Sequence, residues 1–313
     1  MQKYQPHYQG QRYLGNVQNS LTTTYQRLSS GVRINSAKDD AAGLQIADRL
    51  TSQINGLNQG NRNASDGIAL AQTIESGMDE MSGMLQKIRT LAVQASNGTN
   101  TLEDRKALSK EASALANEIS RIADQTTFAG KKILKGYQDN GASIYDKVAG
   151  KQGTAGSTGQ LTLQVGSNKG DTISFQMTNF MFSMIASSAK QHNLVKTGAP
   201  DAGKPIGIQG GVITVSFSTV NDTQSLIGAM DAMIAHVDGA RADLGALQNR
   251  LESSIRNQSN VAANEADARS RIRDADFAEE SANLSQQSII QQAAASMLMQ
   301  ANTRPQLGLS LLG

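Results

Sequence analysis

Residues 28–50, LSSGVRINSAKDDAAGLQIADRL, decide how this chain is organised. Ser29-Ser30-Gly31 is typical of a helix end, because glycine adopts the left-handed conformation past the last turn without steric cost. Ser36 followed by Asp39 fits a capping box, in which the two residues satisfy each other's backbone N–H groups at a helix start. The stretch therefore predicts a helix, a break and a second helix.

Apolar residues on both sides of this break recur at spacings of three and four, which describe one face of a helix. Before the break the stripe consists of Leu14, Val17, Leu21, either Tyr25 or Thr24, and Leu28. After the break a stripe from Leu50 to Ala92 keeps a seven-residue phase, which is typical of a coiled coil or a long bundle. Pro6 and Gly10 argue against a regular helix before about residue 11.

The next segments are predicted from turn and capping residues. Asn97-Gly98-Thr99-Asn100 has turn chemistry and ends the long helix. Thr101 with Asp104 caps another helix that reaches about residue 125, and the short connection makes the two helices antiparallel neighbours.

The middle of the chain has a different pattern. Glycines make 136–160 rich in loops, and alternating apolar residues over 161–165 and 173–177 predict a β-hairpin. Residues 180–185 form either a short helix under the hairpin or an irregular segment. Prolines and glycines indicate an exposed loop up to 211, and residues 213–217 alternate like a short strand.

The C-terminal part mirrors the N-terminal part. Asn221, with Gln224, caps a helix over 222–273, which contains a seam with Leu244, Leu251 and Ile272. Asp274-Ala275-Asp276 interrupts the helical pattern, and Arg304-Pro305 is expected to stop the helix that follows. Apolar positions of this last helix include Phe277, Leu284, Ile289 and Met297. The pattern predicts a mainly α fold, a long antiparallel helical bundle with a small hairpin region and a short central insertion.

Composition excludes several classes of function. The chain has 313 residues and no cysteine, so disulfides and thiolate chemistry are ruled out. The three histidines are scattered, and no catalytic, phosphate-binding or metal-binding motif occurs, so no enzyme, cofactor or metal site is expected. The Asp39-Asp40 and Asp274/Asp276 pairs are better explained as charges at helix starts than as metal ligands.

Charge and hydropathy add two further expectations. Residues 1–38 carry basic side chains and no acid, and residues 281–313 carry only Arg304, so both ends can be buried with few unpaired charges. The basic charges are too sparse for a nucleic-acid arm, so no nucleic-acid partner is expected. No apolar run is long enough for a membrane helix, and no signal-peptide core follows Met1, so export would need a dedicated apparatus.

Several runs resemble bacterial flagellins, the subunits of the flagellar filament. They are residues 28–50, 61–68, 85–94, 97–100, 125–128 with Gly130 and Leu134, 244–250, 270–278, and 291–293 through 301–302. They occur in the order and spacing of the family and cover roughly 14–135 and 225–313. Residues 1–10 do not match the start that is typical of the family.

The resemblance implies a domain order. Residues 1–35 would form the N-terminal helix of the inner tube, D0, and the start of its connection. Residues 36–135 and 222–273 would form the helices of the outer tube, D1. Residues 136–221 would form the hairpin and a small variable surface region, and 274–313 the C-terminal D0 helix.

The resemblance also implies a structural role. The chain would polymerise into an extracellular helical filament for swimming motility, after type III export without a cleaved signal. Its partners would be other copies, an export chaperone, and hook-associated and cap proteins. The alternatives are a hook–filament junction protein, a flagellin with an enzymatic insert, and a coiled-coil scaffold that does not polymerise.

A further implied partner is a flagellin-sensing Toll-like receptor. The matching positions are Gln86, Lys87, Leu91, Gln94 and Glu111. The recognised version of the family has arginine where Lys87 stands, and the two side chains are not interchangeable at a forked contact. Ordinary helix surface and subunit packing is the alternative explanation for Leu91 and Gln94.

Overall fold

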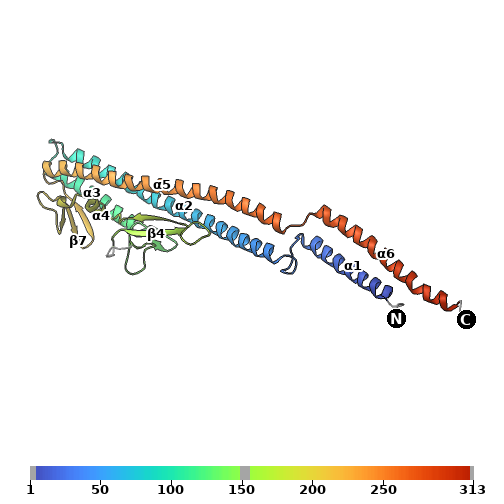
Figure 1. Cartoon of the computed structure of the whole chain (residues 1–313). Coiled ribbons are helices and arrows are strands. Elements are labelled where there is room, and N and C mark those ends of the chain that lie inside the picture. Colours follow the sequence, from blue (N-terminus) through green and yellow to red (C-terminus); the bar gives the residue numbers. More distant parts are fainter. Residues whose placement is uncertain (1–4, 149–155, 311–313) are drawn as a thin grey trace. The chain divides into compact units, whose positions relative to one another are not determined.

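The computed structural model describes the backbone of residues 5–148 and 156–310 (Figure 1). It divides into two compact units, a terminal unit of residues 1–56 with 260–313 and a central unit of residues 57–259. The mainly α fold predicted from the sequence is confirmed. The α-helices are α1 (Gln5–Ser30), α2 (Ala41–Ala95), α3 (Leu102–Gln125), α4 (Phe182–Ser188), α5 (Val220–Arg273) and α6 (Phe277–Ser310).

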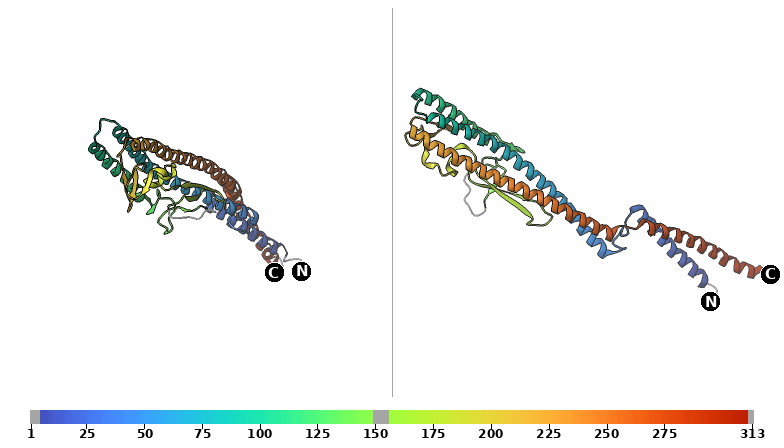
Figure 2. Two further views of the ribbon diagram at one scale, coloured as in Figure 1. Left: turned by 90° about the vertical axis from the view of Figure 1, so that its left-hand side faces the viewer. Right: turned by 90° about the horizontal axis from the view of Figure 1, so that it is seen from above.

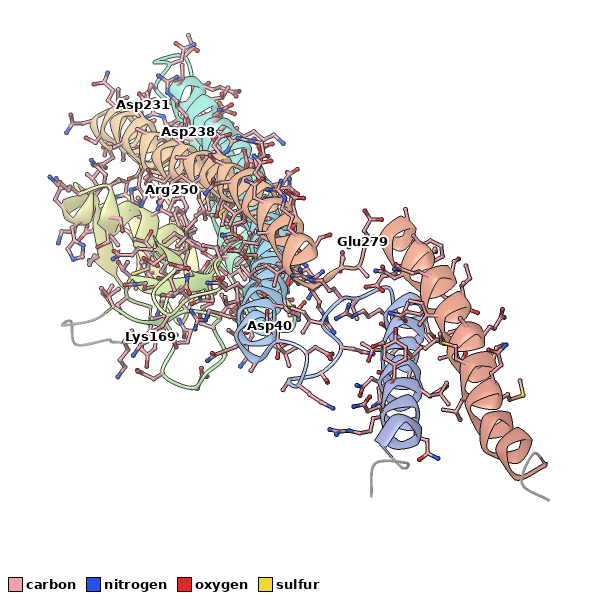
Figure 3. The ribbon with its side chains drawn as sticks, turned by 45° about the vertical axis from the view of Figure 1, so that its right-hand side comes forward. Asp40, Lys169, Asp231, Asp238, Arg250 and Glu279 are labelled. Carbon is pink, nitrogen blue, oxygen red and sulfur yellow. The ribbon has the colours of Figure 1, made fainter. Side chains whose placement is uncertain are left out.

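Helices α2 and α5 run antiparallel in the central unit, and polar side chains join them. Arg89 Nε donates to Asp231 Oδ1 at 2.5 Å, and Ser82 Oγ donates to Asp238 Oδ1 at 3.3 Å. Residue numbers rise along α2 as they fall along α5, which defines the antiparallel direction. Figure 3 shows Asp231 and Asp238 on α5, spaced along the helix as these contacts require.

The turn between α2 and α3 follows the predicted chemistry. Helix α2 ends at Ala95, and Thr101 is the N-cap of α3. Thr101 Oγ1 accepts from the Asp104 backbone N–H at 3.2 Å, and Asp104 Oδ2 accepts from the Thr101 N–H at 2.9 Å. The capping box predicted at this position is therefore confirmed.

Short strands lie beside the helices of the central unit (Figure 2). One pair is β1 (Thr127–Phe128) with β2 (Lys131–Lys132). An antiparallel sheet has the order β3 (Asp146–Lys147), β4 (Gly159–Gln164) and β5 (Thr172–Met177). A mixed sheet has the order β6 (Val195–Thr197), β7 (Ile206–Gln209) and β8 (Val212–Val215). The predicted hairpin is β4 with β5, in which Leu161 lies opposite Phe175.

Residues 195–209 differ from the exposed loop that the prolines and glycines indicated. Strands β6 and β7 pair in parallel, and β7 pairs with β8 in antiparallel register. Ile206 and Gly207 are buried. Glycine is required at 207 because a Cβ atom there would lie 2.6 Å from the Gly198 carbonyl oxygen. The glycine thus marks a close approach of two backbone segments, a role that the sequence pattern does not distinguish from that of a loop.

Side chains of α3 cover the free edge of β8. Asn117 Oδ1 accepts from the Ile213 N–H and its Nδ2 donates to the Ile213 carbonyl, both at 2.8 Å. Ser113 Oγ accepts from the Val215 N–H at 2.8 Å, and Ser109 Oγ accepts from the N–H of Phe217 at 2.8 Å. Positions four apart on a helix therefore match positions two apart on a strand. These bonds satisfy backbone groups that an edge strand otherwise leaves open.

The start of α5 corrects one prediction. The helix begins at Val220, so Asn221 lies inside its first turn and does not cap it with Gln224. Thr219 takes the capping role instead, because its Oγ1 accepts from the Asp222 N–H at 3.1 Å. Its hydroxyl also donates to Asp222 Oδ2 at 2.6 Å.

This assignment predicts unequal effects of two alanine substitutions. Thr219→Ala removes the acceptor for a first-turn N–H group, so we expect it to lower the free energy of unfolding by about 1 kcal/mol. Asn221→Ala should lower it by less than about 0.5 kcal/mol, as for ordinary surface changes. Urea denaturation of both variants measures the difference. A larger loss for Asn221→Ala would restore the cap assignment made from the sequence.

The ends of the terminal helices correct two more predictions. Helix α1 begins at Gln5 and contains Pro6 in its first turn, where a missing N–H costs nothing because it would have no partner within the helix. Gly10 continues the helix. Helix α6 does not stop at Arg304-Pro305 but runs to Ser310. Proline removes one backbone bond inside α6 without ending the helix.

Candidate assembly site

The break between α1 and α2 has the predicted helix end but a different helix start. Gly31 has φ +72°, and its N–H donates to the Arg27 carbonyl at 2.8 Å, which closes α1. Asp39 Oδ2 accepts from the Ser36 N–H at 2.9 Å, and this hydrogen bond closes a turn before α2 begins. Asp40 caps α2, since its Oδ1 accepts from the Gly43 N–H at 2.9 Å. The capping box assigned to Ser36 and Asp39 is therefore wrong as a helix cap.

The electrostatics of this turn follow from its hydrogen bonds. The Asp39 carboxyl accepts hydrogen bonds from the backbone N–H groups of Ser36 and Asn35 and from the Ser36 hydroxyl. These bonds hold the pKa of the Asp39 carboxyl below its usual value. Hydrogen bonds to the ionised form cause this direction of shift. These hydrogen bonds therefore stabilise the folded chain fully above the ordinary carboxyl pKa, and this stabilisation is lost as pH falls through the lowered pKa of Asp39.

The two helix breaks of the terminal unit lie against each other. Val32 forms an antiparallel β-bridge with Asp274. The Arg33 N–H donates to the Arg273 carbonyl at 2.6 Å, and the Ala275 N–H donates to the Gly31 carbonyl at 3.1 Å. These backbone bonds join the connection before α2 to the connection after α5.

Helices α1 and α6 lie side by side and antiparallel (Figure 1). On α1, Leu21 is buried, while Leu14, Val17 and Leu28 are half-buried. On α6, Leu284 is half-buried, and Leu298 approaches α1 so closely that a Cβ atom on Gly10 would lie 2.8 Å from it. The predicted α1 stripe therefore faces α6.

Polar residues take part in this seam, and the apolar pattern identifies only Thr24 among them. Arg27 Nη1 lies 3.0 Å from Glu280 Oε1, and the Glu280 side chain is only 8% exposed. Thr24 Oγ1 donates to Gln287 Oε1 at 3.1 Å, and Thr24 is buried. The predicted stripe allows either Tyr25 or Thr24 at this position, and the structure selects Thr24, because Thr24 is buried against α6 while Tyr25 is 55% exposed.

Large apolar side chains on α6 remain uncovered by α1. Four are more than half exposed: Phe277 at 67%, Ile289 at 67%, Met297 at 72% and Met299 at 65%. At about 100° per residue, their positions spread widely around the helix, outside the side that meets α1. On α1, Tyr13 and Tyr25 are each 55% exposed. A helix that is apolar on most sides is normally surrounded by other helices.

The remaining predicted seam residues fall into three environments. Leu244 and Leu251 are buried in the core of the central unit. Ile272 is half-buried in the terminal unit, near the end of α5. The structure thus places Phe277, Ile289 and Met297 at the surface and the α5 leucines in the interior, although one pattern predicted all of them.

The proposed receptor positions lie in the central unit. Gln86, Lys87 and Gln94 are exposed on α2, and Leu91 is half-buried against the core. Glu111 is exposed on α3.

A groove of about 700 Å³ lies between β5 and α5 in the central unit. His236 lines it, stacks on Phe180 with ring centroids 5.8 Å apart, and has a buried Nε2 without a hydrogen-bond partner. Burial lowers the pKa of His236.

This histidine predicts a pH dependence of stability. The unfolded chain binds a proton on this imidazole more readily than the folded chain does. The free energy of unfolding is therefore at its full value above the unfolded pKa of about 6.5 and decreases as pH falls toward the lower folded pKa. Urea denaturation should give a smaller free energy of unfolding at a pH of about 5.5 than at about 7.5. His236→Gln should reduce the difference, whereas the exposed His192→Gln should keep it. An unchanged difference in His236→Gln would contradict the assignment.

The described residues contain neither a metal-binding cluster nor a membrane-spanning helix. Among residues 9–148 and 156–300, whose side chains are described, no group of three or more His, Cys, Asp or Glu side chains is arranged to hold a metal ion. In the same part of the chain, no helix is long and apolar enough to span a membrane.

Comparisons with known proteins give consistent matches. The "Bacterial flagellin N-terminal helical region" family matches residues 2–139, and the "Bacterial flagellin C-terminal helical region" family matches residues 227–312. Flagellin A of Vibrio anguillarum is 37% identical, and Flagellin A of Vibrio cholerae is 35% identical, each over 96% of both chains. A solved structure described as a flagellar hook-associated protein from Vibrio parahaemolyticus has a TM-score of 0.55 and 17% identity, and covers 75% of this chain and 100% of its own.

Proposed function

The chain belongs to the bacterial flagellin family, and from this premise we infer that its terminal unit drives assembly. It is a structural subunit that polymerises into the helical filament of the bacterial flagellum and serves swimming motility. The family consists of structural proteins, and the proposed role requires no catalysis. The likeness to the hook-associated protein, at 17% identity, shows the fold alone.

The exposed apolar side chains of α6 support this inference most directly. Phe277, Ile289 and Met297 are at least two-thirds exposed in the single chain. Covering such a side chain contributes about 1.5–3 kcal/mol. Several of them together are comparable with the estimated 4–15 kcal/mol cost of association. Neighbouring copies are the natural partners, since each copy offers both the uncovered α6 and the α1 tyrosines.

The geometry of repetition then follows from the type of contact. An α6 surface that contacts a different surface of the next copy makes a heterologous interface. Such contacts continue without closing and build a helical filament. We propose that residues 1–35 and 274–313 line the inner tube, and that the helical parts of 36–135 and 222–273 form the outer tube around it.

The terminal helices are proposed to become ordered as the filament grows. In a free subunit, α1 and α6 can cover only one side of each other, which offsets little of the entropy lost on ordering. Neighbouring copies supply the remaining contacts. The ordering cost is then met at the step in which apolar surface is buried.

Other partners are proposed from the family membership. Export through the flagellar type III apparatus, with a chaperone on the C-terminal helix, would keep the apolar face of α6 covered before assembly. Hook-associated and cap proteins would then contact the two ends of the extracellular filament. A Toll-like receptor is proposed to contact Gln86, Lys87, Leu91, Gln94 and Glu111, of which the central unit exposes all but the half-buried Leu91.

A single charge on α6 tests the proposal. Ile289→Glu should reduce filament growth at least about tenfold, because burying an unpaired carboxylate between copies costs several kcal/mol. Val212→Glu makes a similar change at another exposed aliphatic residue, on β8, and should leave growth within about twofold, as surface changes usually do. Light scattering and negative-stain electron microscopy measure growth. Normal filaments from Ile289→Glu would overturn the proposed role of α6.

A further inference from the structure

Three polar pairs run along the seam between α1 and α6. Gln291 Nε2 donates to Gln18 Oε1 at 2.6 Å, Thr24 donates to Gln287 at 3.1 Å, and Arg27 pairs with Glu280 at 3.0 Å. They lie along one side of two antiparallel helices, because residue numbers rise on α1 as they fall on α6. The third pair is the most enclosed, because the Glu280 side chain is 8% exposed and that of Arg27 is 31% exposed.

Apolar contacts alone do not select one alignment of these helices. The α1 stripe has leucines seven residues apart at Leu14, Leu21 and Leu28, so an α6 side chain that packs on Leu21 would meet another leucine after a slide of seven residues. The same slide would bring Arg27 opposite apolar or amide side chains and leave the half-buried Arg27 and the buried Glu280 without charged partners. Buried ionic and polar pairs can therefore specify a register even where they add little stability.

The charged pair lies directly beside the joined helix breaks. The Arg27 backbone carbonyl accepts from the Gly31 N–H at the end of α1, and the Gly31 carbonyl accepts from the Ala275 N–H. On the other side, Asp276 Oδ1 accepts from the Ala278 N–H at 2.8 Å at the start of α6. Glu280 is one turn further on, while its neighbour Glu279 is exposed and points away from α1 (Figure 3).

We propose that the Arg27–Glu280 pair, supported by Thr24–Gln287 and Gln18–Gln291, sets the register of α6 on α1 and so determines which apolar residues of α6 face neighbouring copies. This inference rests on the proposed assembly role. A slip of seven residues moves α6 by about 10 Å along α1, at about 1.5 Å per residue. Ile289 and Met297 would then no longer lie opposite the surface of the neighbouring copy that is proposed to cover them.

Charge reversal tests the pair. Arg27→Glu and Glu280→Arg each place like charges together in the seam, and each should lower filament yield at least about tenfold. The double variant restores opposite charges and should regain yield to within about threefold of the wild type. The control is Arg271→Glu and Asp267→Arg, which reverse an exposed pair at 2.7 Å within α5 and should leave yield unchanged.

A distance measurement reports the register itself. The chain has no cysteine, so cysteines introduced at the exposed Asn19 and Ser296 carry the only spin labels. In filaments diluted with unlabelled wild-type protein, the double electron–electron resonance distance should be single and narrow. Glu280→Gln should broaden it or add a population shifted by several ångströms, whereas Asp267→Asn should not.

Each outcome bears on a different claim. Normal yield of Arg27→Glu and Glu280→Arg, with an unchanged distance in Glu280→Gln, would overturn the register proposal and leave the assembly role intact. Loss of yield without recovery in the double variant would also overturn it, because the two charges would then act through other partners. Failure of the wild-type chain to polymerise would instead overturn the assembly role.

Discussion

A variant consisting of residues 41–273 is expected to form no filaments at concentrations at which the full chain polymerises. It lacks α1 and α6, and with them Phe277, Ile289 and Met297, the exposed apolar residues proposed to drive growth. Without these surfaces, association would lose most of its hydrophobic driving force. Sedimentation and electron microscopy after seeding with filament fragments measure the loss.

The same variant should keep the central unit folded. Its core is built from α2, α3, α5 and the strands, and includes Ile88, Ile119 and Phe217. The urea midpoint of the central unit should therefore stay within a few tenths molar of the full-length value. Filaments formed by the variant would refute the assembly role of the terminal helices. An unfolded variant would be replaced by deletion of 277–313 alone.

The second large effect is expected in the core of the central unit. Phe180→Ala should lower the free energy of unfolding by about 3–5 kcal/mol, the usual loss for a buried phenylalanine. Phe180 is fully buried, stacks on His236, and donates its backbone N–H to the Leu134 carbonyl at 2.8 Å. Alanine would leave a cavity where β5 ends and α5 passes. Urea denaturation of the monomer measures the loss.

Phe277→Ala is the matched control, because the same atoms are removed from a side chain that is 67% exposed. It should change monomer stability by less than about 0.5 kcal/mol. It should nevertheless weaken filament growth, since Phe277 is proposed to be covered by another copy. Equal destabilisation of the monomer by both variants would contradict the division between core and assembly surface.

The sequence by itself determined the features that depend on local conformation. Gly31 ends α1 because glycine tolerates φ +72°, and Thr101 with Asp104 starts α3 through bonds that span one turn. The β4–β5 hairpin follows from alternating apolar residues. The family resemblance also came from contiguous runs, and the comparisons confirm it.

Only the tertiary structure decided between equivalent local signals. Thr219 and Asn221 are both good capping residues, and the end of the preceding strand, held where Phe217 bonds Ser109, places the helix start after Thr219. The match of Asn117 to the β8 edge joins residues almost a hundred positions apart, so no local pattern could predict it.

The sequence and the tertiary structure each determined a part of the candidate assembly site. The apolar stripes predicted that α1 and α6 pair, because periodicity defines a helix face. They did not show that Arg27 and Glu280 meet inside the seam, nor that Ile289 remains exposed while Leu21 is buried. Those differences depend on which side of α6 meets α1, and contacts between distant parts of the chain decide that orientation.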